Sequence, residues 1–310
     1  MRPAFTAKSK RQVTEACTEC EAAGHSLAWL RHELDEVDRE NQQVLVLGDG
    51  SYDTVYMWNH VPAHTTLLAR SARNRALFHL PAPGAHRNRK YGERAPTPQE
   101  VWQTRRGWQQ LALDVRGRIR HLQYQVTGPF VRKGAPDCPL FLLVVRGKNR
   151  VRNGRRFKRE PLPFLVNAVR DEQGHWVLPL PVATLLFWAW QRWEIEVCHR
   201  ELKTNFGLGD KQCFNPHATV LSVQWSAWVY ALCILAAYRT WGVCGGPPAP
   251  YRWWRGAGRW SFNTLWRAYR TALWGQTDFS PLWPFSLANL HEFEVMSQGW
   301  RNASLAATHS

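Results

Sequence analysis

The stretch QVLVLGDGSY, residues 43–52, joins an apolar run to a turn that carries an acid. Residues 43–47 predict a buried strand, because the run is apolar rather than alternating. The triplet Gly48-Asp49-Gly50 predicts a tight turn. Asp49 is therefore expected at the carboxyl end of a strand, where open α/β sheets bind their ligands. The alternative is that Asp49 only caps the turn, as Asp beside Gly often does.

Strand signals recur on the downstream side of this stretch, between residues 65 and 180. The runs are TTLLA at 65–69, residues 111–115, HLQYQV at 121–126, FLLVV at 141–145 and FLVNAV at 164–169. Turn signals that contain Gly or Pro separate them. On the upstream side, residues 11–37 predict a helix with a break at Gly24 and His25.

A second informative stretch is QRWEIEVCHRELKTNFGLG, residues 191–209. Helical spacing predicts that one acid and four basic side chains share one face of a helix, and that the acid is buried among them. These residues are Arg192, Glu196, His199, Arg200 and Lys203. A carboxylate can bind a divalent metal while basic neighbours bind phosphate oxygens, as phosphodiester cleavage requires. The alternative is a solvated face with ordinary Glu–Lys pairs.

The spacing of Arg192, Glu196 and Lys203, followed by Gly-Leu-Gly at 207–209, resembles the Tyr-Arg-Glu-Lys signature of bacterial insertion-sequence transposases. That family has a DDE active site in a ribonuclease H-like core. The signature's Tyr falls at Ala189 in this chain. Similarly, residues 49–52 resemble the Asp-x-(Gly or Ala)-Tyr element that carries the family's second catalytic Asp. The resemblance covers about residues 43–238.

The resemblance implies an α/β fold with a ribonuclease H-like core, a β-rich insertion between the second and third acids, and a helical C-terminal part. The expected domains are a partial core at 1–60, the insertion at 61–180, core helices at 181–241 and a Trp/Arg-rich tail at 242–310. In such an enzyme two Mg²⁺ ions, or Mn²⁺ in their place, assist the attack of water and then of a freed 3′-hydroxyl on DNA.

By this resemblance Asp49 and Glu196 are the expected catalytic metal ligands. The expected DNA- and phosphate-binding side chains are Tyr52, Arg192, His199, Arg200, Lys203, Arg150, Arg152, Arg155 and Arg156. The last four belong to a basic block around a predicted hairpin turn, for which the alternative is a solvated loop.

The family's first Asp precedes the first helix, but residues 1–10 contain no acid. The chain therefore resembles an N-terminally truncated transposase, for which we expect little or no transposition by the 310-residue product. Asp53 and Asp171 are the weaker candidates for a substitute acid.

Composition favours a polyanionic partner. The 310 residues include 40 Lys plus Arg against 24 Asp plus Glu, a formal charge of +16, which suits DNA first and a membrane surface second. Seven scattered Cys and no evident secretory signal indicate a reducing interior, so we expect a cytoplasmic, nucleoid-associated protein. Residues 218–238 lack charge but contain Ser and Gln, and we interpret them as a buried core helix rather than a membrane span.

Two functions follow from these observations. The first is a DDE transposase that cleaves DNA at transposon ends, working as a homodimer or with a full-length transposase. The second is a non-catalytic DNA-binding derivative of such an enzyme. A basic membrane-surface protein is a third class, supported only by charge and Trp content.

Overall fold

The structure is a computed structural model. It describes residues 17–82, 84, 86, 88–115, 119–146, 150–152, 155–157, 160–210, 215–242, 246–247 and 261–276. The chain divides into two compact units, residues 1–195 and 196–310, each considered by itself below.

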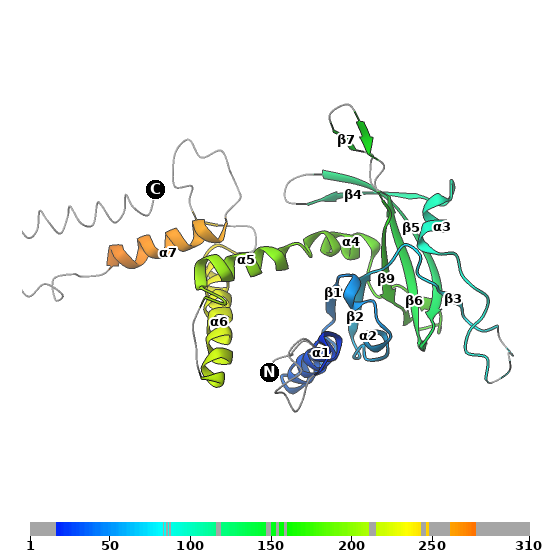
Figure 1. The fold of residues 1–310 in the computed structure, drawn as a ribbon, viewed down its shortest axis with the longest axis horizontal. Helices are drawn as coiled ribbons and strands as arrows, with labels where there is room; N and C mark the ends of the chain where they lie inside the picture. The colour runs from blue at the N-terminus through cyan, green and yellow to red at the C-terminus, as the bar shows by residue number, and fades with distance from the viewer. Residues whose placement is uncertain are drawn as a thin grey trace, which may run out of the picture. The chain divides into compact units, whose positions relative to one another are not determined.

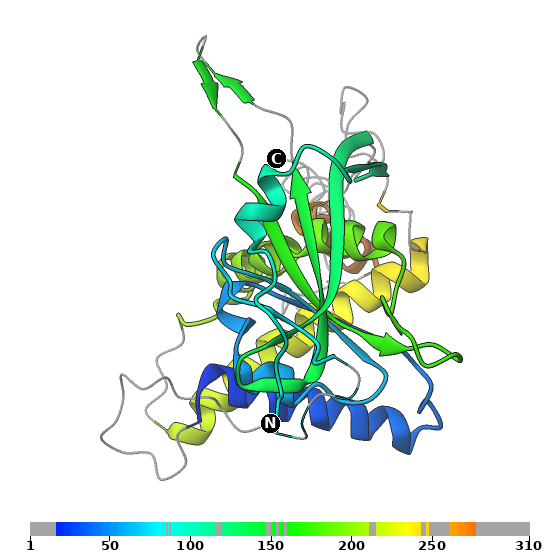
Figure 2. The ribbon, with the colours of Figure 1, turned by 90° about the vertical axis from the view of Figure 1, so that its right-hand side faces the viewer.

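A seven-stranded mixed sheet forms the centre of the first unit (Figures 1 and 2). Its order is β1 (Val44–Gly48), β2 (Thr65–Arg70), β9 (Leu162–Asn167), β6 (Ala135–Arg146), β5 (Ile119–Arg132) and β3 (Phe78–His79), and β4 (Gln109–Asp114) also pairs with β5. The pair β1–β2 is parallel, whereas the other described pairs of this sheet are antiparallel. The fold is thus mixed α/β.

All five downstream strand predictions are confirmed, because each run overlaps a strand of this unit. The last of them is split between β9 and the short hairpin of β10 (Val169–Arg170) and β11 (Trp176–Val177). The predicted strand at 43–47 is also present, as β1, but the prediction that it is buried is wrong. Among the described strands β1 pairs only with β2, so its first four residues are half-buried at the edge of the sheet.

Helices cover both faces of the sheet, so each face contributes a separate apolar cluster. One cluster, built on Leu67 and Ala69 of β2, packs against α1 (Glu19–Glu36), α2 (Val55–Asn59) and α3 (Pro98–Gln103). The other, built on Leu68, packs against α4 (Val182–Gln191). Successive residues of a strand point to opposite faces, which is why adjacent β2 residues enter different clusters.

Helix α1 is continuous, so the predicted break at Gly24 is wrong. A Cβ on Gly24 would lie 2.8 Å from Cε1 of Tyr56 in α2. The glycine therefore allows close approach of two packed helices and does not interrupt the helix. Thr18 fixes its start through a capping box, in which the Thr18 hydroxyl accepts from the Glu21 N–H and the Glu21 carboxylate accepts from the Thr18 N–H.

The second unit contains α6 (Pro216–Trp241), α7 (Phe262–Gln276) and nearly all of α5 (Glu194–Phe206). Its small core joins the three helices through Ala237 of α6 and through Phe262 and Leu265 of α7, with Phe206 of α5 packed against them. Trp266, from the predicted tail, packs its ring against Phe206. Three further Trp residues of this tail, Trp253, Trp254 and Trp260, lie outside the described part of the chain.

The prediction that residues 218–238 form a buried core helix is wrong in this structure. Helix α6 does form, but one side chain series remains exposed because α5 and α7 cover only part of its surface. The exposed series comprises Leu221, Trp225, Trp228, Leu232 and Leu235. Residues His217–Trp241 are long and apolar enough to cross a membrane by length and composition, a test that core helices of soluble proteins also pass.

Candidate functional site

Asp49 lies directly after β1, at the carboxyl end of the parallel pair. The register pairs Gly48 with Ala69, so the next residues, Asp49 and Arg70, occupy adjacent positions at the ends of the two strands. Asp49 also caps the short 3₁₀ helix η2 (Gly50–Tyr52), because its Oδ1 accepts from the Ser51 N–H at 2.8 Å and from the Ser51 hydroxyl at 2.6 Å. The turn-capping alternative is therefore part of its role.

The carboxyl group of Asp49 is held in its ionised form. The bonds from Ser51, first from its hydroxyl and then from its N–H, lower the pKa of Asp49 below its ordinary value, and the charges of Arg192 and Arg70 add to that shift. Asp49 is exposed, so its negative charge is available to a cation or to water.

The electrostatic interaction between Asp49 and Arg192 joins residues that are 143 positions apart in the sequence. Arg192 caps the C-terminus of α4, the helix on the second face of the sheet, and both residues belong to the first unit. The charge of Arg192, from the stretch 191–209, thus acts on Asp49, from the stretch 49–52, at the carboxyl end of β1.

The signature stretch itself is not one uninterrupted helix, contrary to prediction. Helix α4 ends at Gln191, and α5 begins at Glu194. The N–H of Ile195 bonds the carbonyl of Arg192 across a tighter three-residue step. Arg192 therefore does not share a helix with Glu196.

The prediction that Glu196 is buried is also wrong, because Glu196 lies exposed in the first turn of α5. The buried acid of this helix is Glu201, only 7% exposed. Its carboxylate accepts from Nδ2 of Asn205 at 2.5 Å and lies 3.5 Å from the guanidinium of Arg200. The expected phosphate-binding side chains His199, Arg200 and Lys203 are exposed on α5.

Tyr52 faces α1 rather than solvent. Its hydroxyl donates to Oε1 of Glu19 at 2.9 Å, and burial, followed by this bond, raises the pKa of Tyr52 to about 12. A phosphate contact by Tyr52 would have to replace the bond to Glu19.

The four arginines expected to bind DNA lie on the hairpin of β7 (Arg150–Arg152) and β8 (Arg155–Phe157). The pairing of these strands fits the predicted turn at 153–154. The side chains of the four arginines lie outside the described part of the structure.

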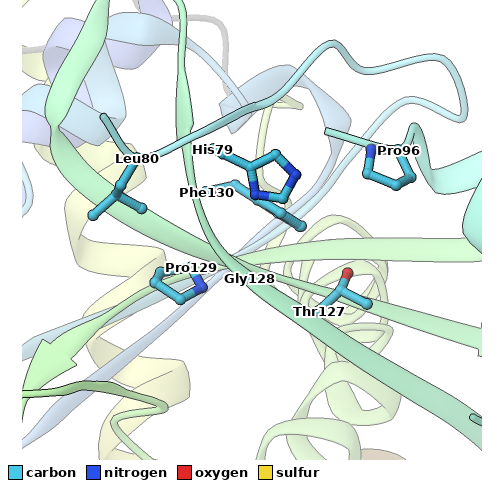
Figure 3. A pocket seen from close by; sticks show the side chains of 7 residues that line it. All are labelled: His79, Leu80, Pro96, Thr127, Gly128, Pro129 and Phe130. Carbon is cyan, nitrogen blue, oxygen red and sulfur yellow. The ribbon is translucent and has the colours of Figure 1, made fainter. Parts of the chain in front are cut away.

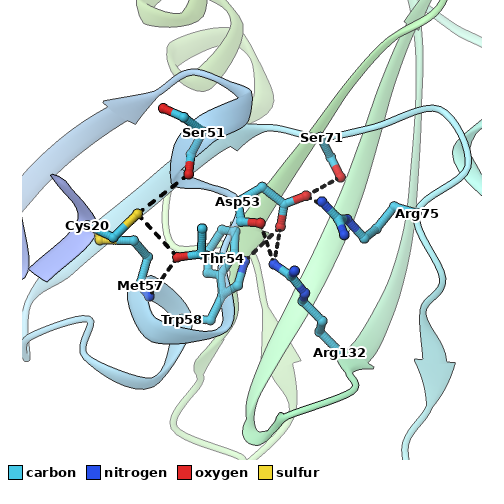
Figure 4. Close-up of polar contacts among 9 residues, drawn as sticks. All are labelled: Cys20, Ser51, Asp53, Thr54, Met57, Trp58, Ser71, Arg75 and Arg132. Atoms are coloured by element: carbon cyan, nitrogen blue, oxygen red, sulfur yellow. Dashed lines mark hydrogen bonds and ion pairs between the residues drawn. The ribbon is translucent and has the colours of Figure 1, made fainter. Parts of the chain in front are cut away.

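The sequence did not predict that Asp53 has a structural role. Its side chain is fully buried, and both oxygens accept strong hydrogen bonds (Figure 4). Oδ2 accepts from Ser71 Oγ at 2.6 Å and from Arg75 Nε at 2.7 Å. Oδ1 accepts from Arg132 at 2.7 Å and from Trp58 Nε1 at 3.0 Å. Asp53 therefore ties the turn after β1 to the end of β2 and to β5.

These contacts exclude Asp53 as the substitute metal ligand, since none of its oxygen capacity is directed to an open site. Asp171, the other candidate, caps the turn between β10 and β11 by accepting from the N–H groups of Gln173 and His175. The role of Asp171 is local, whereas only the pairing of the strands reveals the role of Asp53, because its partners lie up to 79 residues away.

A metal site requires several ligand side chains around one point. Among the described residues no three His, Cys, Asp or Glu side chains gather around one point. Asp49 suits a hard cation as a single ionised oxygen ligand. One carboxylate does not constitute a two-metal centre, and Glu196 belongs to the other unit.

Two of the hollows formed by described residues of the first unit contain polar groups. One, of about 660 Å³, is lined mainly by apolar groups beside β3 and β5 (Figure 3). It contains the imidazole of His79, and the Thr127 hydroxyl at its wall has no hydrogen-bond partner among the described residues. The other, of about 630 Å³, follows β2 and is lined by Arg70, Arg73, Asn74, Gln99 and Glu160 together with Ser71, Ala72, Pro161 and Pro163. Only the second combines cationic groups with a position next to Asp49.

Neither a comparison with models of known protein families nor one with curated proteins finds a match to this chain.

Proposed function

We propose that the chain is a DNA transposase of the DDE type, acting on phosphodiester bonds at transposon ends, with α1, β1 and the turn that carries Asp49 as part of a ribonuclease H-like core. The observation that carries the proposal is that the charge of Arg192 acts on Asp49 at the carboxyl end of β1. Each belongs to a motif that resembles the same family, and nothing in their sequence separation requires the fold to bring their charges within range of each other. The +16 charge is consistent with DNA as the substrate.

The roles of the side chains follow from their charge. Arg192 and Arg70, whose charges act on Asp49, would bind the oxygens of the phosphate that is attacked, and so neutralise the charge that develops on them. His199, Arg200 and Lys203 would contact the DNA backbone from the exposed face of α5. The Arg150, Arg152, Arg155 and Arg156 hairpin would add phosphate contacts that do not read sequence.

Mg²⁺, or Mn²⁺ in its place, would supply the activation of the attacking water and the stabilisation of the leaving oxygen. In this proposal Asp49 and Glu196 are its protein ligands. Asp49 fits that role because it is ionised and exposed. The cytoplasm, close to the nucleoid, is the compartment in which such a protein would meet DNA, as a homodimer or with a full-length transposase.

One observation favours the second candidate, a DNA-binding derivative without catalysis. Among the described residues Asp49 belongs to no group of three or more His, Cys, Asp or Glu side chains, and Asp53 is occupied by structural hydrogen bonds. In this version the protein keeps the basic surface and occupies transposon ends without cleaving them.

Nicking of supercoiled plasmid DNA in Mg²⁺ or Mn²⁺ distinguishes the two. An active transposase, with all three acids supplied by this chain, is expected to give nicking that Asp49→Ala and Glu196→Ala each abolish, while Asp171→Ala, at a half-buried acid that caps a turn, leaves it intact. The DNA-binding derivative expects no nicking, but steeply salt-dependent DNA binding that is indifferent to Asp49 and Glu196 substitution. Absence of both activities would refute both functions.

A further inference from the structure

The hollow that follows β2 has the composition of an anion site. Its lining includes two arginines, Arg70 and Arg73, one acid, Glu160, which pairs with Arg73, and two residues with amide side chains, Asn74 and Gln99. The hollow begins at Arg70, which is the neighbour of Asp49 across the parallel pair. A ligand that fills it would therefore continue directly from the Asp49 site.

The loop that carries these groups is held in place before any ligand binds. The Ser71 N–H donates to the carbonyl of Pro163, and the Gln99 N–H donates to the carbonyl of Arg73, both at 2.9 Å. At the ends of the loop, the Ser71 hydroxyl and Arg75 Nε both donate to buried Asp53. Such a loop loses little conformational entropy when it binds a ligand.

Glu160 sets the orientation of Arg73. One nitrogen of Arg73 lies 3.0 Å from the Glu160 carboxylate, and both side chains are more than half exposed. A guanidinium has five N–H donors, so this pair leaves further donors for an anion. The carboxylate also competes with any anion for the charge of Arg73, so removing its charge should strengthen anion binding.

We propose that this hollow binds a backbone phosphate of the DNA strand, next to the phosphate at Asp49. The inference rests on the proposed function and adds Arg70, Arg73, Asn74 and Gln99 to its DNA-contacting residues. Arg70 lies between the two phosphates, Arg73 and the two amides bind the outer one, and Glu160 limits the affinity.

The test is fluorescence anisotropy of a labelled DNA duplex, titrated with the full chain across a series of KCl concentrations. Arg73→Gln should weaken binding several-fold and lower the slope of log Kd against log salt by about one, as the loss of one phosphate contact does. Arg70→Gln should do the same. Glu160→Gln should tighten binding several-fold. The matched control is Arg39→Gln, an exposed arginine in the loop before β1 and hence at the opposite end of that strand.

The outcomes separate this inference from the function on which it rests. If the wild-type chain binds no DNA, the proposed function fails. If it binds, but Arg70→Gln and Arg73→Gln behave like Arg39→Gln and Glu160→Gln changes nothing, the hollow is not a phosphate site while DNA binding stands. Inorganic phosphate provides a second arm: if millimolar phosphate abolishes the effect of Arg73→Gln at constant ionic strength while DNA remains bound, the hollow selects the free ion and the proposal of a DNA phosphate is overturned.

Discussion

Removing the carboxylate of Asp53 should destabilise the first unit more than any surface substitution. In Asp53→Ala the two buried donors, the Trp58 indole and the Ser71 hydroxyl, lose their acceptor, at about 1–3 kcal/mol each. Arg75 and Arg132 lose their counter-charge, but their side chains are 25% and 15% exposed, so water offsets part of that loss. We therefore expect a fall in the free energy of unfolding of about 3–5 kcal/mol, the usual cost of breaking a buried ion pair.

The variant Asp53→Asn separates charge from shape. It keeps the side-chain volume and one acceptor oxygen, but it turns an NH₂ group towards side chains that are themselves donors. We expect a loss of at least about 2 kcal/mol, because the charge-assisted bonds disappear and donors face each other.

Urea denaturation followed by far-UV circular dichroism measures these losses, and hydrogen exchange of the β2 amides assigns them to the first unit. The matched control is Glu160→Gln, which removes an ion pair to Arg73 whose side chains are 71% and 56% exposed and should cost no more than about 1 kcal/mol. A change of less than about 1 kcal/mol in Asp53→Ala would show that Asp53 does not hold the loop of the proposed phosphate site.

Three further predictions concern single positions. Ser51→Ala should raise the pKa of Asp49 in the folded protein, because it removes one of the two bonds that lower it. The stability that the lowered pKa provides is present above the ordinary Asp pKa and is lost as the pH falls through the folded value, so the Ser51→Ala variant should lose less stability in acid than the wild type. Carboxyl-carbon NMR titration measures the pKa, and urea denaturation at several pH values measures the loss of stability. Gly24→Ala should destabilise the chain by about 1–2 kcal/mol, because its Cβ would meet Tyr56, yet stabilise the Tyr56→Ala variant by about 1 kcal/mol, where only helix propensity remains; equal effects in both backgrounds would contradict the packing account. Asn167→Val should cost about 1–3 kcal/mol for each backbone group that it leaves unpaired, since the Asn167 amide both accepts from and donates to β2; urea denaturation with no measurable change would refute this.

The strands were predictable because their signal is local. Runs such as 65–69 and 141–145 consist of apolar or β-branched residues bounded by turn signals, and the neighbours that decide their conformation are adjacent in sequence. The position of Asp49 after a strand was predictable for the same reason. The extent to which β1 is buried was not predictable, because an apolar run does not show whether its strand lies at the edge of the sheet.

The wrong predictions about the acids have a different cause. In the sequence Asp53 is only an acid close to Asp49. Its structural role could not be predicted, because its partners at positions 71, 75 and 132 become its neighbours only in the folded sheet. Glu196 and Glu201 both fit a helical face, and the choice of which is buried depends on how the helix packs. Helical spacing gives the direction of a side chain but not what covers it.

The central claim is that Asp49 and Glu196 bind one shared cation, and Mn²⁺ binding followed by electron paramagnetic resonance tests it most directly. If the two acids share an ion, Asp49→Ala and Glu196→Ala should each weaken Mn²⁺ binding, and the double variant should bind no more weakly than the weaker single variant, because residues that act on one site are not additive. Losses that add, or a wild-type chain that binds no Mn²⁺, would contradict the transposase account.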